Sequence, residues 1–209
     1  TIQDVAMSVY FSRQKRTYLY APLILLFIAS VVDASYAASY VINPNNTNVR
    51  FAIERFKTAA TTGGFYNVKG QLQYDPNLKT GDISLTIPMS SLSTGNRIFD
   101  NKLMGADFFN TQIFPLAHFK STNWYFNKDK VNPQLIRVDG NLTLHGETHP
   151  ISLMASKFSC SQISTAKKKV CGGEFATKID RTKWNINKYS LFGLTKNLDL
   201  KVKIEALEQ

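Results

Sequence analysis

The sequence predicts an all-β domain of about eight antiparallel, up-and-down strands. Apolar and polar residues alternate with a period of two in several short segments, which is typical of strands with one buried and one wet face. Turn residues separate these segments at hairpin spacing, and no long helical pattern interrupts them. One buried face per strand fits either a sandwich of two sheets or a closed barrel with an apolar interior. Closure would remove the exposed edges, and eight strands leave room for about one small ligand.

A targeting segment precedes this domain. Basic residues at positions 13, 15 and 16 are followed by an apolar run over residues 21–32, which is too short for a comfortable membrane span. Small residues then lead to a cleavage position after Ala37. An uncleaved anchor helix is the alternative, because only the length of the apolar run distinguishes a signal peptide from a membrane anchor here.

We therefore expect two parts, a signal peptide over residues 1–37 and a folded domain over residues 38–209. Met7 is a candidate start, which would place residues 1–6 upstream of it. Cleavage near Ala37 would give a periplasmic or secreted protein.

The predicted strands follow one another with ordinary turn chemistry between them. Residues 61–64 (Thr-Thr-Gly-Gly) are a turn or bulge signal, and residues 75–77 (Asp-Pro-Asn) break the second strand. The third strand ends at Pro88. The predicted strands cover residues 49–53, 68–74, 83–87, 114–125, 136–144, 148–158, 175–181 and 198–204.

One segment, residues 89–111, loses the alternation. Leu103, Phe108 and Phe109 suggest short helical turns there, which makes this a helical insertion between the third and fourth predicted strands. Such an insertion could cover one end of a sheet.

The fifth and sixth strands form the most regular hairpin. A tight turn at residues 146–147 would place Leu144 opposite His149. The next inward pair would then be Leu142 and Ile151. With this register, the apolar residues of both strands share one face.

The overall charge is basic, with 25 Lys and Arg against 15 Asp and Glu and a formal net charge of +10. Such a balance favours anionic partners, such as the headgroups of a membrane surface. We expect no nucleic acid partner, because the basic residues are spread along strands and no recognition motif accompanies them.

The two cysteines, Cys160 and Cys171, lie close together in the chain. In an exported protein such a pair is most simply a disulfide that staples a loop. A redox or zinc site lacks the spacing and the further ligands.

Short motifs recur along the chain in a definite order. They are Gly64-Phe65, Val68-Lys69-Gly70, Tyr74-Asp75, Ser91-Leu92-Ser93-Thr94, Asp100 with Leu103, Asp107-Phe108-Phe109, Phe114-Pro115, Phe119-Lys120-Ser121, residues 140–148 (Gly-Asn-Leu-Thr-Leu-His-Gly-Glu-Thr) and Ile179-Asp180-Arg181. In this order and spacing, over nearly all of residues 38–209, the chain resembles the YceI-like family of polyisoprenoid-binding, lipocalin-like proteins. It departs from the family pattern at Asn46-Thr47 and at Lys102, where histidines are common.

The resemblance implies a lipocalin-like eight-stranded barrel with a short helical insertion. Its apolar bore would bind a long-chain isoprenoid, of the quinone or polyprenyl phosphate type, or a similar amphiphilic lipid. No catalytic residue set or cofactor comes with the family, so we expect a non-catalytic binding, sequestration or transport protein. The alternative is a periplasmic stress-response or interaction module with a filled core and no lipid ligand.

The inward phase of the strands would line the bore. Packing of the same residues into a filled core is the alternative, because the alternation shows only that a side chain points inward and fits both an open bore and a filled core. The residues are Phe51, Ile53, Leu72, Leu85, Ile87, Phe119, Ile136, Val138, Leu142, Leu144, Ile151, Leu153, Phe175, Ile179, Leu200, Val202 and Ile204.

Four polar residues could serve a lipid headgroup or form an internal ion pair. Arg181 falls in the inward phase, where a charge needs a partner. Asp100 and Asp107 are its candidate internal partners, and a lipid phosphate is the other. His149 lies near the rim of the apolar face.

We expect no metal site and no enzyme activity. The histidines at 145 and 149 flank a turn and cannot chelate together as they would on a helix. The serines lack a nucleophile elbow or a triad-like context. We expect transient contact with a membrane surface, and a homodimer is left open.

Overall fold

A computed structural model of the chain describes residues 37–56, 58–163, 168–188 and 194–209. The predicted signal peptide, apart from its last residue, lies outside the described residues. The strands are β1 (Ala38–Ile42), β2 (Asn48–Arg55), β3 (Ala59–Phe65), β4 (Lys69–Asp75), β5 (Thr80–Pro88), β6 (Leu116–Phe126), β7 (Leu135–Leu144), β8 (Glu147–Gln162), β9 (Lys169–Asp180) and β10 (Asn197–Glu208). The helices are α1 (Arg97–Met104) and the 3-10 turns η1 (Met89–Ser91) and η2 (Arg181–Trp184).

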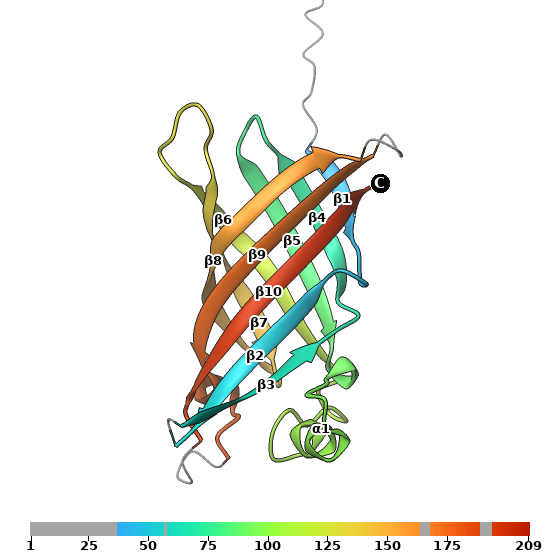
Figure 1. Cartoon of the computed structure of the whole chain (residues 1–209), viewed down its shortest axis with the longest axis vertical. Coiled ribbons are helices and arrows are strands. Elements are labelled where there is room, and N and C mark those ends of the chain that lie inside the picture. Colours follow the sequence, from blue (N-terminus) through green and yellow to red (C-terminus); the bar gives the residue numbers. More distant parts are fainter. Residues whose placement is uncertain (1–36, 57, 164–167, 189–193) are drawn as a thin grey trace, which may run out of the picture. The chain divides into compact units, whose positions relative to one another are not determined.

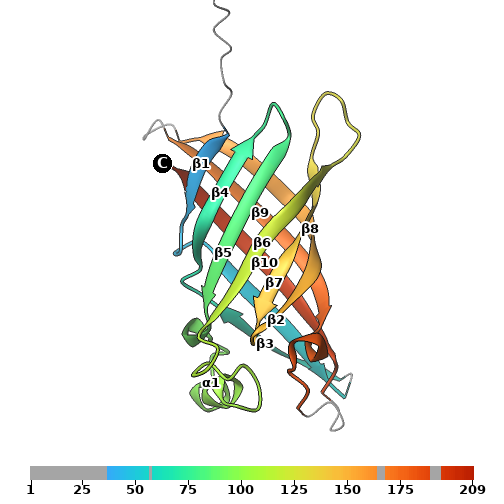
Figure 2. The ribbon, with the colours of Figure 1, turned by 180° about the vertical axis from the view of Figure 1, so that it is seen from behind.

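Within the described residues, ten antiparallel strands form one sheet, and eight of them close into a barrel (Figures 1 and 2). The ring runs β1-β4-β5-β6-β7-β8-β9-β10, and pairing of β10 with β1 completes it. The predicted all-β antiparallel barrel with one short helix is therefore confirmed. Its interior is one apolar core to which every strand of the ring contributes.

The first strand of the barrel is split into two pieces. β1 and β2 both pair with β10, β1 with residues 206–208 and β2 with residues 199–203. The break between them is held by Glu205, whose backbone carbonyl accepts from the backbone N–H of Asn43 at 2.8 Å and from Oγ1 of Thr47 at 3.3 Å. The side chain of Asn46 donates to the Glu205 carboxylate at 2.7 Å.

The predicted strands omitted β1 and β3, so the helix follows β5 and not a third strand. Residues 61–64 of β3, Thr-Thr-Gly-Gly, predict a turn or bulge because they contain two glycines, but they belong to a strand. Tertiary packing explains Gly63: an added Cβ there would lie 2.5 Å from the ring of Phe51, its register partner on β2.

The β2–β3 hairpin continues the wall beyond the closed ring. The outer edge of β3 meets the segment that follows η1, where Gly64 and Ser93 exchange two backbone hydrogen bonds of 2.9 Å. Figures 1 and 2 both show α1 at this end of the barrel. The expectation that residues 89–111 cover one end of the sheet is confirmed.

The β7–β8 hairpin has a different register from the one predicted. Leu144 pairs with Glu147, and Leu142 pairs with His149. The turn consists of His145 and Gly146, both with positive φ (50° and 80°), which is typical of a two-residue type I′ hairpin turn. The register therefore moves by two residues, an even number, and the inward face is unchanged.

Ile136 is the one predicted inward residue that the structure places on the outer face. Tyr125 pairs with Arg137, whereas the next residue, Phe126, pairs with Leu135. Ile136 is therefore the extra residue of a β-bulge, and it is 42% exposed. Leu135 takes the inward position.

Cys160 and Cys171 form a disulfide, as predicted, across the register of β8 and β9. Cys171 is fully buried, and Cys160 packs against the core. Among the described residues, no helix is long and apolar enough to cross a bilayer.

Candidate functional site at one end of the barrel

The middle of the barrel is filled by side chains. The cavity there measures only about 10 Å³, and nine side chains from both walls enclose it. Apart from Ile136, the predicted bore residues all belong to or pack against this core, with Ile151 only partly buried. The residues around the small cavity are Ile83, Leu85, Phe119, Trp124, Val138, Leu153, Phe175, Val202 and Ile204.

A larger apolar hollow, the end pocket, lies where α1 meets β2, β3 and β10. It has a volume of about 200 Å³. Two of the predicted bore residues line it, together with one predicted headgroup residue. The lining is Phe51, Ile53, Thr61, Phe99, Lys102, Leu103, Phe108, Phe109, Arg181, Ile186, Leu194 and Leu198.

Helix α1 is held over this pocket by its N-terminal residues. The side chain of Asn96 caps the helix by accepting from the backbone N–H groups of Ile98 and Phe99 at 3.0 and 3.3 Å. Asp100 in the first turn accepts from the backbone and hydroxyl of Thr94 at 2.7 and 2.6 Å. These bonds orient the helix so that Leu103 is buried at the pocket.

A cluster of three aromatic rings adjoins the end pocket, and two of them, Phe51 and Phe109, line it. The ring centroids of Phe65 and Phe109 lie 5.3 Å apart, and Phe51 lies 5.8 and 6.2 Å from them. The two contacts of Phe109 are edge-on, an arrangement that stabilises aromatic clusters beyond simple burial. The three rings bring β2, β3 and the α1 segment together.

Arg181 is a buried cation at the wall of the end pocket. It is 2% exposed, its Nε donates to the backbone carbonyl of Thr195 at 3.0 Å, and its Nη1 donates to that of Ile186. Burial lowers the pKa of the Arg181 guanidinium from its ordinary value, and the neighbouring Asp180 carboxylate opposes this shift. The site thus holds a cation at the edge of an apolar surface.

The two predicted carboxylate partners of Arg181 have contacts of their own. Asp100 accepts from Thr94, as described, and Asp107 lies 3.5 Å from Nζ of Lys188. The ion pair of Arg181 with either one stays a prediction.

His149 lies beside Trp184, which closes the same end of the barrel. The two rings meet edge to face with centroids 5.0 Å apart, and Nε2 of His149 is buried without a hydrogen-bond partner among the described residues. Nδ1 of His145 lies 3.1 Å from the backbone carbonyl of Trp184. The described residues contain no group of three His, Cys, Asp or Glu that could hold a metal ion.

Sequence reasoning missed most of the end pocket. Leu103, Phe108 and Phe109 predict a cover for one end of the sheet, but their pattern does not assign them to a site. Ile186 and Leu194 fall in a connection without alternation, so no periodic signal identified them. The loss of alternation in residues 89–111 was the one usable signal, because it indicated an end cap.

Comparison with known proteins agrees with this architecture. A family model described as the YceI-like domain matches residues 40–206. A UPF0312 protein of Vibrio cholerae is 27% identical over 190 residues, which cover 88% of this chain and 95% of that protein. Protein YceI of Escherichia coli O157:H7 is 28% identical over 179 residues, 84% of this chain and 90% of that protein.

A solved structure shares the fold at lower identity. The polyisoprenoid binding domain from Saccharophagus degradans, implicated in plant cell wall breakdown, superposes with a TM-score of 0.59. It is 14% identical and covers 83% of this chain and 99% of its own chain.

Proposed function

Since the chain belongs to the YceI-like domain family, we propose that it binds a long-chain isoprenoid, of the quinone or polyprenyl phosphate type, or a similar amphiphilic lipid, without catalysing a reaction on it. The end pocket carries this proposal, because it joins an apolar surface to a buried cation. The polyisoprenoid-binding domain of similar fold supports the ligand class.

The driving force would be burial of the isoprenoid tail. Transfer of apolar surface out of water contributes about 25 cal/mol per Å². Leu103, Phe108 and Phe109 supply such surface beneath α1. A charged or polar head would lie towards Lys102 and Arg181, the two cations of the lining.

A long chain needs more room than the end pocket provides. The end pocket has a volume of about 200 Å³, which lies below the roughly 300–1,000 Å³ of most small-molecule sites. The chain would therefore extend into the barrel, and Phe119 and Phe175 in the filled middle would change rotamer to admit it. Such rearrangement would make binding slower than docking to a preformed bore.

We place the protein in the periplasm or outside the cell, after removal of residues 1–37. The Cys160–Cys171 disulfide supports an oxidising compartment. N-terminal sequencing of the exported protein tests the cleavage near Ala37. Retention of residues 21–32 in the mature protein would contradict it.

We also propose that the end of the barrel with α1 contacts anionic membranes transiently. Ile98 on α1 is 84% exposed and Ile113 is 67% exposed, and Arg97 and Lys102 add positive charge to the same segment. Exposed apolar side chains beside cations suit a lipid interface. A homodimer stays a prediction that light scattering tests.

The central experiment is organic extraction of natively purified protein followed by mass spectrometry. An isoprenoid should be recovered from the wild type and should raise its melting temperature when added back. Leu103→Trp, which fills the end pocket, should weaken isoprenoid binding at least about tenfold, because Leu103 is buried there. Val131→Trp is the control, since it adds the same ring at a position that is 95% exposed and does not line the end pocket.

A protein that is reproducibly empty and that no isoprenoid stabilises would exclude lipid binding. The second candidate, an interaction module with a solid interior, would then stand. The cavity of about 10 Å³ in the middle of the barrel is the observation that favours it.

A further inference from the structure

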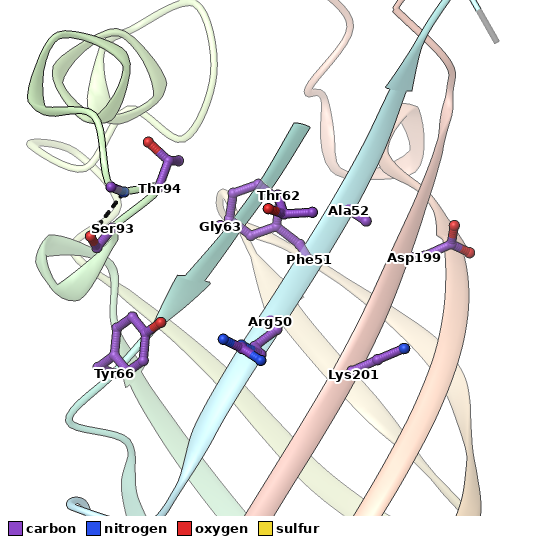
Figure 3. Close-up of a pocket in the computed structure, with 11 residues that line it drawn as sticks. Arg50, Phe51, Ala52, Thr62, Gly63, Tyr66, Ser93, Thr94, Asp199 and Lys201 are labelled. Carbon is purple, nitrogen blue, oxygen red and sulfur yellow. Dashed lines mark hydrogen bonds between the residues drawn. The ribbon is translucent and has the colours of Figure 1, made fainter. Parts of the chain in front are cut away.

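A second hollow, the outer groove, lies on the outside of the barrel over β2, β3 and residues 93–95 (Figure 3). It has a volume of about 530 Å³. Its polar lining includes Arg50, Thr62, Tyr66, Ser93, Asp199 and Lys201. It is more polar than the end pocket, and isoprenoid binding does not require it.

Two cations line this groove, and in Figure 3 their side chains extend in opposite directions, Arg50 towards Tyr66 and Lys201 away from it. Arg50 on β2 and Lys201 on β10 are register partners, and both are exposed. Like charges directly opposite each other on one face destabilise a sheet. None of the ion pairs among the described residues involves either of them.

The nearest carboxylate does not neutralise this pair. Asp199 lies two residues from Lys201 on β10, and its oxygen is 3.3 Å from Nζ of Lys178 on β9. Its charge is therefore matched by a third cation. The groove keeps an excess of positive charge.

Gly64 and Tyr66 shape the groove beside Arg50. Gly64 is the β3 register partner of Arg50, and a Cβ added to it would lie 3.1 Å from the Tyr66 hydroxyl. The missing side chain thus lets the tyrosine hydroxyl approach the strand. The backbone N–H of Tyr66 donates to Oγ of Ser91 at 2.9 Å, and Figure 3 shows the Arg50 side chain directed towards Tyr66.

We propose that the outer groove binds an organic phosphate, held by Arg50 and Lys201 with the hydroxyl of Tyr66 as a further donor. A guanidinium can donate two parallel hydrogen bonds to a phosphate, and a lysine ammonium adds a mobile point charge. Both side chains are exposed, so Lys201 would turn towards an anion held by Arg50, and each cation would then attract it. The groove exceeds the needs of a bare phosphate and falls in the range of small-molecule sites.

Two sources fit this chemistry, a free organic phosphate and the phosphate of a prenyl lipid. Phe51 lines both the outer groove and the end pocket, and its ring packs against Gly63, which has no side chain to separate them. A prenyl phosphate could therefore contact both hollows. The phosphate site itself does not rest on the proposed lipid function.

The test is calorimetric titration of the full chain at low salt with inorganic pyrophosphate, geranylgeranyl phosphate and geranylgeraniol. Replacing both groove cations, Arg50→Gln with Lys201→Gln, should weaken binding of a phosphate-bearing probe at least about tenfold. Lys157→Gln with Lys203→Gln is the matched control, because it removes two exposed cations of the outer face that do not line the groove. Thermal melts of both double variants verify that they fold.

Dependence of pyrophosphate binding on the groove cations would show that the phosphate group alone is sufficient for binding, as a free organic phosphate requires. Dependence seen only with geranylgeranyl phosphate would identify a lipid headgroup. Either result supports the site. Equal weakening in both double variants, or no weakening in the groove variant, overturns it. If the wild type binds the phosphate-bearing probes but not geranylgeraniol, the proposed lipid function fails and the phosphate site is still supported.

Discussion

Trp184 joins the α1 end of the barrel to the β7–β8 hairpin through one side chain. It is 1% exposed, and its indole Nε1 donates to the backbone carbonyl of Leu142 at 3.1 Å. Its ring also packs against His149. One residue therefore both fills space and satisfies a buried backbone acceptor.

Trp184→Phe should destabilise the protein by about 1–3 kcal/mol, because the carbonyl of Leu142 loses a buried donor. Urea denaturation measures this loss in the free energy of unfolding, provided that the dependence of that free energy on urea concentration is the same in both proteins. Trp124→Phe is the control, since Nε1 of Trp124 is buried without a partner among the described residues. Equal losses in the two variants would show that ring volume, and not the hydrogen bond, sets the cost.

Asp180 makes stability depend on pH at the same end of the barrel. Its carboxylate accepts from Oγ1 of Thr182 at 2.7 Å and from the backbone N–H of Thr182 at 3.0 Å. The bond from the Thr182 hydroxyl is the main cause that holds the pKa of Asp180 below its ordinary value. The folded state therefore favours the charged form.

Because the folded pKa of Asp180 is lowered, its stabilisation is present above about pH 4 and is lost as the pH falls through the folded value. Wild type should melt above Asp180→Asn at about pH 7, and the gap should shrink below about pH 4. Melting curves across this range check it. A difference in melting temperature that widens as the pH falls would contradict the lowered pKa of Asp180.

At the scale of elements, the disulfide links the two strands of the β8–β9 hairpin close to the loop that joins them. Cys160 and Cys171 are 11 residues apart and are register partners. A link of this length restricts the unfolded chain more than it changes the folded one.

Reduction of the disulfide should lower the free energy of unfolding by about 3 kcal/mol, from loop-closure entropy. Denaturation of the wild type with and without reductant measures this without changing a side chain. Cys160→Ala with Cys171→Ala should give a similar loss and no response to reductant. An unchanged midpoint in reductant would mean that the staple does not stabilise this hairpin.

β3 depends on one glycine for its packing. Gly63→Ala would place Cβ 2.5 Å from the Phe51 ring, so the ring must move. We expect a loss of about 1–3 kcal/mol from overpacking. Gly172→Ala should cost less, because its nearest neighbour would lie at 3.7 Å. Thermal melts compare the two, and equal losses would contradict the packing role of Gly63.

At the scale of the whole molecule, the barrel is a closed ring whose middle is filled and whose ends differ. The end pocket of about 200 Å³ opens at α1, whereas the middle cavity is about 10 Å³. How far a lipid chain enters therefore depends on whether the core can rearrange.

We expect affinity to rise from geraniol through farnesol to geranylgeraniol, because each added unit buries more apolar surface inside the barrel. Phe175→Ala, which enlarges the middle, should favour the longest alcohol most. Titration of the three alcohols into both proteins measures this. A plateau at geraniol would show that the middle stays filled and that only the end pocket binds.

The sequence by itself determined the all-β class, the inward face of most strands and the disulfide. Alternation carries this information locally, because successive side chains of a strand point to opposite faces. Leu198 to Ile204 illustrate this in β10, where even-numbered residues are buried as predicted. The predicted register of the β7–β8 hairpin is wrong by two residues, because the turn consists of His145 and Gly146. An even shift leaves the same side chains on the inward face.

Only the tertiary structure decided ring closure, the bulge at Ile136, the strand character of β3 and the location of the hollows. Each of these depends on contacts between residues far apart in the chain, such as Phe51 with Gly63 and Phe109 or Arg50 with Lys201. A periodic pattern shows that a side chain points inward. Whether space is left beside it depends on the side chains that reach the same place from the other strands.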